Sequence, residues 1–173
     1  MPFMQCRHSV FSMHHSVDGI LSVNGTPYVF LDSIGYIEGD RGYSFPRKYV
    51  WTQCSFPDGA LMLSIAEILF GCFHFTGVIG IVHLRGKEYS LATYLGAKAV
   101  KIEAGEIIIQ QGGFTLAVKP QEQSGHPLRA PVGGAMVRTI HEHPSCQVFY
   151  RFKRNEIPLL ELDAPNAACE YEY

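Results

Sequence analysis

The chain has 173 residues, a formal net charge of −2 and a charged fraction of only 17%. Its length suits a single domain, residues 1–173, with a sizeable core. It has neither the basic field that attracts nucleic acid nor the polybasic run that binds anionic membranes, so we expect neither partner.

The cysteines favour a reducing compartment. The five cysteines lie at positions 6, 54, 72, 146 and 169, form no CxxC motif and leave one thiol unpaired in any pairing scheme. The N-terminal segment lacks an apolar core of signal-peptide length, and the longest apolar run, near Ala60 to Leu84, is interrupted by Glu67 and His74. We therefore expect a cytoplasmic protein without an integral membrane segment.

Short apolar runs separated by turn signals fill the chain. Val10 to Val23 ends at Asn24-Gly25 and a second run starts at Tyr28, which predicts a hairpin. Ala60 to Phe70 fits both helical and strand periods, and we interpret it as a strand because proline and glycine bound it closely. Residues 121–134 are polar and rich in proline and glycine, which predicts a loop. The remaining predicted strands are 73–84, 88–95, 97–103, 106–111, 114–119, 135–141, 146–152, 157–163 and 167–173.

About a dozen short strands at this spacing predict an all-β fold, an antiparallel barrel or sandwich, with no helix required. The predicted strand 73–84 is apolar on both faces, whereas a monomeric barrel has one dry face. Another part of the chain or a second copy should cover its outside. We expect a homo-oligomer that associates through this apolar outer sheet face.

The stretch from Gly35 to Cys54 concentrates the polar and aromatic groups suited to a binding site. Alternation places each of two trios on one face of an extended chain, with Gly42 and Phe45-Pro46 breaking the ladder between them. We predict a hairpin whose two limbs face a shared cavity. The trios are Tyr36, Glu38 and Asp40, and Tyr49, Trp51 and Gln53, with Arg41 beside the first.

Each candidate has a plainer alternative. Glu38 and Asp40 are candidate cavity acids, but a salt bridge to Arg41 or Arg47 that fixes the turn is the commoner use. Trp51 either lines a ligand pocket or packs in the core.

Two further candidates have two readings each. Gln53 would bind either the turn or a ligand, because a buried amide needs partners. Arg129, in a proline-flanked segment, either reaches across a barrel mouth to a carboxylate or is a surface arginine.

The histidines raise the question of a metal. His141 and His143 lie two residues apart, and His14 or His15 could add a third ligand. No carboxylate or cysteine stands at a supporting spacing, so we expect no metal. No nucleotide-binding or nucleophile-elbow motif is present, and we expect no cofactor.

Several motifs together resemble one family. Residues 36–54 read Y-x-E-x-x-x-G-x-x-F-P-x-x-x-x-W-x-Q-C, residues 86–89 read G-K-x-Y, and residues 125–131 read G-x-P-L-R-A-P. In order and spacing these, with the segment from Cys146 to Glu172, resemble the C-terminal half of the tocopherol cyclase family. Arg41 and Tyr49 stand where that family usually has tryptophan.

The resemblance implies a lipocalin-like β-barrel of about ten to twelve strands that binds a hydrophobic, isoprenoid-type small molecule. It also implies acid-promoted cyclisation or hydration of an alkene, with Glu38 or Asp40 as the proton donor. A carboxyl group in an apolar cavity has a raised pKa, and aromatic faces stabilise a carbocation. Two alternatives stay open: a carrier that binds without reacting, and a structural or interaction barrel with a filled interior.

Overall fold

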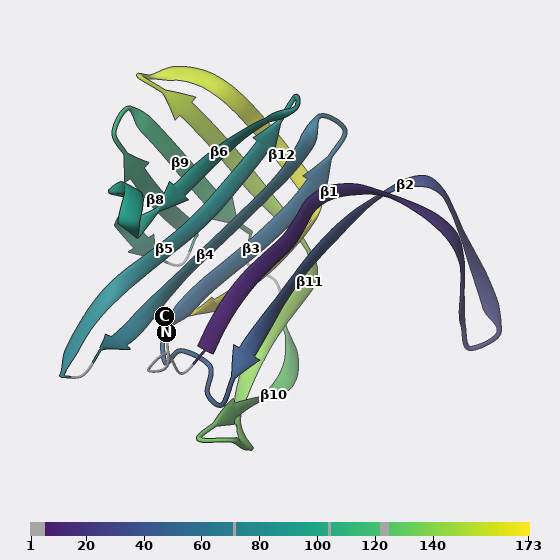
Figure 1. The fold of residues 1–173 in the computed structure, drawn as a ribbon, viewed down its shortest axis with the longest axis horizontal. Coiled ribbons are helices and arrows are strands. Elements are labelled where there is room, and N and C mark those ends of the chain that lie inside the picture. The colour runs from purple at the N-terminus through teal and green to yellow at the C-terminus, as the bar shows by residue number, and fades with distance from the viewer. Residues whose placement is uncertain (1–5, 71, 104, 122–124) are drawn as a thin grey trace.

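The computed structural model describes residues 6–70, 72–103, 105–121 and 125–173, which form twelve antiparallel strands and one short 3₁₀ turn (Figure 1). The all-β antiparallel fold expected from the sequence is confirmed. The strands are β1 (Cys6–Val23), β2 (Thr26–Gly42), β3 (Tyr49–Phe56), β4 (Gly59–Phe70), β5 (Phe73–Leu84), β6 (Lys87–Ala92), β7 (Lys98–Glu103), β8 (Glu106–Gln111), β9 (Phe114–Pro120), β10 (His126–Val132), β11 (Ala135–Arg154) and β12 (Ile157–Glu172).

Strands β1 and β2 form a long hairpin by themselves. The ladder runs from Cys6 opposite Gly42 to Val23 opposite Thr26. Asn24 and Gly25 close it with φ angles of 50° and 82°, the left-handed pair that a tight hairpin turn requires. The hairpin expected at this Asn-Gly is confirmed, and we call it the ribbon.

The second expected hairpin, between residues 36–40 and 49–53, is wrong. Strand β2 pairs with β1, whereas β3 pairs with β4 and β12. The chain leaves the ribbon at Tyr43 and crosses to the sheet along the β10–β11 turn, where Phe45 donates its N–H to Pro131 and Gly134 donates to Tyr43. The two limbs of the motif therefore lie in different layers.

The other ten strands form one curved sheet. Its order is β6-β5-β4-β3-β12-β11-β9-β8-β7, and β10 pairs with β11 beside this path. Among the described residues no ladder joins β6 to β7, so the sheet is not closed by hydrogen-bonded strands.

A glutamine side chain spans the gap instead. At the end of β8, Gln111 accepts the Ala92 N–H at 2.9 Å and donates to the Ser90 carbonyl at 3.0 Å. One backbone donor of β6, the Ala92 N–H, and one acceptor, the Ser90 carbonyl, thereby have the partners that a neighbouring strand would otherwise provide.

Four predicted boundaries differ from the structure. β11 and β12 each run through a predicted break, because bulges absorb Pro144 and the segment at residues 165–166 without ending the strand. Residues 126–132 of the expected loop form β10, since an edge strand tolerates Pro127 and Pro131. Residues 122–124 of that loop lie outside the described residues. The predicted strand 88–95 ends at Ala92 and continues as the 3₁₀ turn Thr93–Leu95.

The inner face of the sheet surrounds a filled core. Alternate residues of β4 point inward, so that Leu61, Leu63 and Ile65 are fully buried. Tyr150 and Phe152 of β11 fill the same interior, and the Tyr150 hydroxyl lies 2.5 Å from the Thr52 hydroxyl. Large side chains thus occupy the interior.

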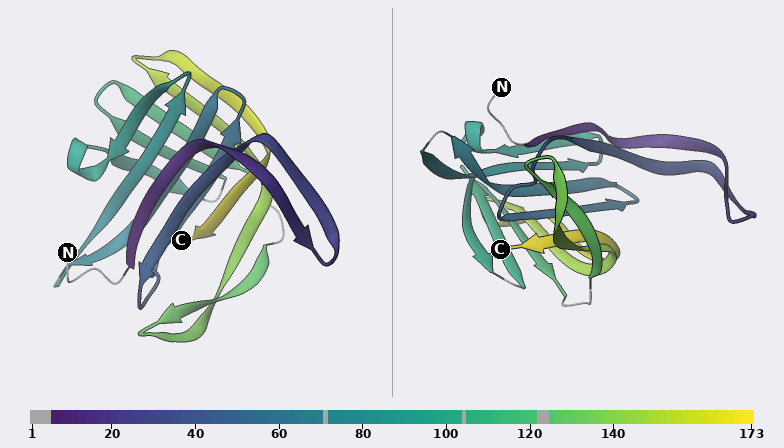
Figure 2. Two further views of the ribbon diagram at one scale, coloured as in Figure 1. Left: turned by 45° about the vertical axis from the view of Figure 1, so that its right-hand side comes forward. Right: turned by 90° about the horizontal axis from the view of Figure 1, so that it is seen from below.

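The outer face of β4 and β5 is partly covered by the ribbon. Met13 packs on Ala60 and Met62, with Ile81 of β5 beside them. Figure 2 shows the ribbon lying across this face and then projecting past the sheet. The two-faced apolar character predicted for β5 is confirmed, and part of the chain covers one portion of its outside. Of the described residues, none belong to a helix with the length and apolarity needed to cross a membrane.

Candidate functional site

A pocket of about 570 Å³ lies between the ribbon and the outer face of β3 to β5. Its walls are mainly apolar and aromatic, with carboxylates from the ribbon, β4, β11 and β12. Pockets of ~300–1,000 Å³ with this kind of lining are typical small-molecule sites. The residues that matter for its chemistry are His8, Glu38, Asp40, Tyr49, Trp51, Phe75, Ile79, Glu142 and Glu170.

Strand register builds the pocket floor. Trp51 on β3 lies opposite Ser64 on β4 and opposite Glu170 on β12. Glu170 in turn lies opposite Glu142 on β11. Because directly opposite residues share a face, one row across the outer surface carries a hydroxyl, an indole and two carboxyl groups.

Glu38 joins the ribbon to this row. Its Oε2 atom accepts hydrogen bonds from the Tyr36 hydroxyl at 2.5 Å and the Trp51 indole N–H at 3.1 Å. The predicted proximity of Glu38 and Trp51 is therefore found, although it arises between two layers rather than within one hairpin. Both side chains are half-buried.

His8 sits between the two predicted acids. Its Nδ1 lies 3.1 Å from Asp40 Oδ1, and its Nε2 lies 3.2 Å from Glu38 Oε2 in an ion pair without a well-directed hydrogen bond. Burial lowers the pKa of His8, but the two carboxylates outweigh burial and raise the pKa from 6.5 to about 9. The imidazole is therefore a cation at neutral pH.

Cys6 contacts the same carboxylate oxygen of Asp40 as His8 does. The Cys6 thiol donates to Asp40 Oδ1 at 3.6 Å. Burial, followed by the charge of Asp40, raises the pKa of this thiol to about 12. It is a neutral donor rather than a nucleophile.

Glu170 has a different environment from Glu38. Burial raises the pKa of Glu170, and the nearby charges of Glu142, Asp40 and Glu38 add to the rise, while a hydrogen bond from the Tyr49 hydroxyl at 2.6 Å opposes it. Burial also raises the pKa of Tyr49, so its hydroxyl stays protonated and donates. The raised pKa favours the protonated form of the Glu170 carboxyl group.

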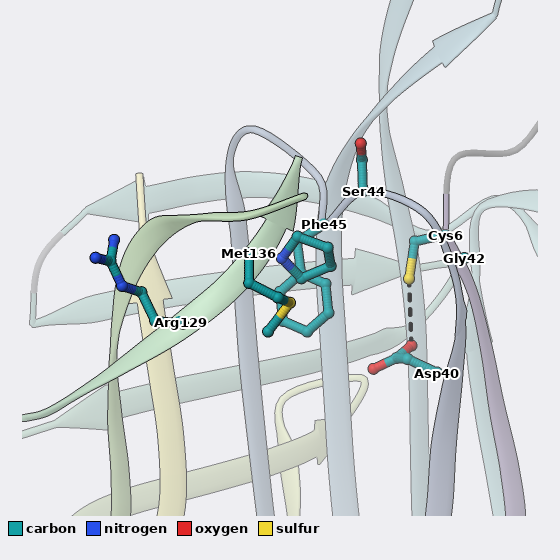
Figure 3. A pocket seen from close by; sticks show the side chains of 8 residues that line it. Cys6, Asp40, Gly42, Ser44, Phe45, Arg129 and Met136 are labelled. Carbon is teal, nitrogen blue, oxygen red and sulfur yellow. Dashed lines mark hydrogen bonds between the residues drawn. The ribbon is translucent and has the colours of Figure 1, made fainter. Parts of the chain in front are cut away.

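A smaller pocket of about 290 Å³ adjoins the first and shares Cys6, Asp40 and Phe45 with it. Figure 3 shows Arg129 on the side opposite Asp40, with Phe45 and Met136 between them. The Arg129 guanidinium donates to the Val137 carbonyl at 3.2 Å, and Arg129 is exposed. Of its two predicted roles, the exposed surface position is the one observed.

Three other predicted ligand residues are not among those that line the larger pocket: Tyr36, Arg41 and Gln53. Arg41 is exposed and makes no ion pair within the described part of the chain, so the salt bridge expected for Glu38 or Asp40 is replaced by His8. Gln53 shares the face of Trp51 but donates to the Ser55 hydroxyl at 3.1 Å, outside the pocket lining.

The position of the site differs from the expected one. The sequence predicted that the tryptophan and the acids face a hollow inside the barrel. Instead Val50, Thr52 and Cys54 point into the core, and Trp51 points outward towards the ribbon. Alternation correctly predicts which residues lie on the same face of a strand, but it does not determine which face is directed towards the interior.

The histidine candidates are dispersed. His143 Nδ1 lies 3.2 Å from the Cys169 carbonyl, and His141 is exposed. His14 stacks near His83, and His15 lies 3.0 Å from the Ser12 hydroxyl. The described residues contain no group of three side chains placed to hold a metal ion.

The lining residues that the sequence did not single out include His8, Glu142 and Glu170. Alternation along β12, where Glu170 and Glu172 share a face, was an available signal. Pairing of β12 with β3 was not, because the ladder joins segments more than a hundred residues apart. Comparisons with protein-family models, with curated proteins and with solved structures find no match.

Proposed function

We propose that the protein binds a hydrophobic, isoprenoid-type small molecule in the pocket between the ribbon and the outer sheet face. The main support is the mainly apolar pocket of about 570 Å³ with a group of polar side chains close to Trp51. Phe75 and Ile79 supply apolar wall, while Glu38 and Glu170 stand near Trp51 to accept hydrogen bonds from a ligand hydroxyl. An apolar body with one hydroxyl fits this distribution.

Trp51 provides the test, because it is the one tryptophan of the chain and its indole lies at the site. Titration of the protein with a C20 prenyl alcohol should change the Trp51 fluorescence and saturate. Ala66→Phe, which places a ring in the pocket, should weaken binding at least tenfold. Ala117→Phe is the matched control, since Ala117 on β9 is half-buried and does not line the pocket, and it should bind like the native protein. Equal binding by all three proteins, or none by the native protein, would refute the proposal.

A second candidate, acid-promoted cyclisation or hydration of an alkene, is favoured by the raised pKa of Glu170. The Glu170 carboxyl would transfer its proton to an alkene carbon, so that the O–H bond breaks as a C–H bond forms. The Trp51 ring would lie beside the resulting carbocation and stabilise it. A substrate hydroxyl or a water molecule would then form the C–O bond and return a proton to Glu170, with no net oxidation.

The geometry favours Glu170 over Glu38 and Asp40 as this acid. Glu38 already accepts two hydrogen bonds and faces the His8 cation, and Asp40 pairs with the same ring. Incubation with a prenylated hydroquinone, followed by chromatography, should show a chromanol product that Glu170→Gln abolishes. Binding without turnover would leave the carrier function and remove the catalytic one.

A further inference from the structure

The ribbon is longer than the face that it covers. The end of the hairpin that holds the β1–β2 turn bends and projects past the sheet (Figures 1 and 2). The ladder has a bulge between Val17 and Gly19, where Asp18 accepts the Asp32 N–H at 2.8 Å and the Ser16 hydroxyl donates to Asp32 at 2.9 Å. We call residues 18–32 the arm.

The arm carries exposed apolar side chains on both faces, with Leu21 opposite Tyr28 on one face and Ile20, Val29 and Leu31, which we call the arm stripe, on the other. Ile20 lies directly opposite Val29, and Leu31 follows two residues on. Their exposed fractions are 73%, 61% and 78%. A two-stranded hairpin with exposed apolar side chains is at best marginally stable in water, so this element needs a partner surface.

The outer face of the sheet has exposed apolar residues that its own ribbon does not cover. The ribbon covers the outer face of β5 at Ile81, but Phe73, Phe75 and Ile79 on the same face remain exposed. We call these three residues the bare strip. The same chain therefore has a ribbon that extends past its own sheet and a sheet face that extends past its own ribbon.

We infer that two copies of the chain exchange arms, with the arm stripe of each lying on the bare strip of the other, beside the proposed ligand pocket that Phe75 and Ile79 also line. This contact continues the packing that the ribbon already makes within one chain, where Met13 lies on Ala60 and Met62 of the same outer face. The arrangement is reciprocal, as a two-fold dimer requires.

The area is sufficient for a dimer of moderate affinity. One face of an arm measures about 25 by 10 Å from the strand rise and spacing. Two such faces and the two surfaces that they cover amount to about 1,000 Å², near the lower limit of specific interfaces. Association in the micromolar range is the corresponding expectation.

A lipid surface fits the arm less well. Both long edges of a two-stranded ribbon leave backbone groups unpaired, which hydrocarbon does not satisfy. The charged residues of the arm are Asp18 and Asp32, with no lysine or arginine to attract anionic headgroups.

Sedimentation equilibrium from 1 to 100 µM tests the exchange. The native protein should approach twice its mass of 19.3 kDa, whereas Leu31→Glu on the arm and Phe73→Glu on the strip should each weaken association at least tenfold. Gln110→Glu, an exposed change of the same charge on β8, should leave it unchanged. Circular dichroism of each variant verifies folding.

Mixing the two defective variants gives the decisive comparison. The Phe73→Glu chain retains a native arm and the Leu31→Glu chain retains a native strip, so their mixture contains one intact contact and should associate more strongly than either alone. A native protein that stays monomeric at 100 µM, a dimer that survives Leu31→Glu, or a mixture that does not associate would each overturn the inference.

Discussion

His8 connects two acidic side chains that the sequence motif placed together, and it does so from a different strand. Both ring nitrogens face carboxylates, at 3.1 Å from Asp40 and 3.2 Å from Glu38. Glu38 in turn accepts the Trp51 indole N–H. The series of contacts from Asp40 through His8 and Glu38 to Trp51 therefore holds the ribbon against the sheet beside the pocket.

The raised pKa of His8 predicts a pH dependence of stability. Below about pH 6.5 the ring is protonated in both states and its contribution is complete. As the pH rises from 6.5 to about 9 the unfolded chain loses the proton while the folded protein keeps it, so the contribution declines and is gone above the folded pKa. The native free energy of unfolding should fall by about 2 to 3 kcal/mol across this window.

Urea unfolding of the native protein and of His8→Gln at pH 6.5 and 9.5 measures this difference. The variant should show a flatter dependence, whereas His126→Gln, a change at an exposed histidine, should follow the native protein. Identical pH profiles for native protein and His8→Gln would show that the histidine does not hold the ribbon electrostatically.

At the scale of elements, the join between the two ends of the curved sheet depends on Gln111. Replacement by leucine keeps the size but removes both the acceptor for the Ala92 N–H and the donor to the Ser90 carbonyl. Because Ala92 is buried, its N–H would lack a partner, and we expect a loss of about 1 to 3 kcal/mol of unfolding free energy.

Hydrogen exchange at the Ala92 amide and urea unfolding check this prediction. Exchange at Ala92 should accelerate in Gln111→Leu, and the neighbouring exposed Gln110→Leu should have little effect on either measurement. An unchanged exchange rate in Gln111→Leu would mean that the ends of the sheet are held by core packing alone.

The elements show which parts of the structure local sequence predicts. Asn24-Gly25 fixes a hairpin because its turn geometry is local, and alternation in residues 73–84 assigns the two apolar faces of β5. Alternation also places Glu38 on the same strand face as Tyr36 and Asp40. It likewise places Trp51 on the same strand face as Tyr49 and Gln53. Alternation could not show that β2 pairs with the preceding strand β1 and not with β3. That pairing depends on residues 6–23 as much as on residues 36–54.

The bulges explain the misplaced strand ends. Pro144 reads as a terminator, yet the β11 ladder to β12 resumes at Cys146 after a shift of register. Pro127 and Pro131 similarly suggested a loop, although β10 pairs with β11 alone. Proline excludes a regular central ladder, but it does not exclude a bulge or an edge.

At the scale of the whole molecule, the chain separates a filled interior from an open exterior site. Tyr150 and Phe152 of β11 occupy the interior with Leu61 and Leu63 of β4, whereas the pocket exists because the ribbon stands over β3 to β5. Loss of the ribbon would therefore remove the pocket while leaving the core of the sheet intact. The proposed ligand site is a property of two layers rather than of a barrel.

A crystal structure of the protein with a brominated C20 prenyl alcohol tests this most directly, because the anomalous signal of bromine locates the ligand without assumptions. Bromine should appear between the ribbon and the outer face of β3 to β5, within contact of Phe75 or Ile79. Bromine among the core side chains around Tyr150 and Phe152, or no ordered bromine at saturating ligand, would contradict a site on the outer face.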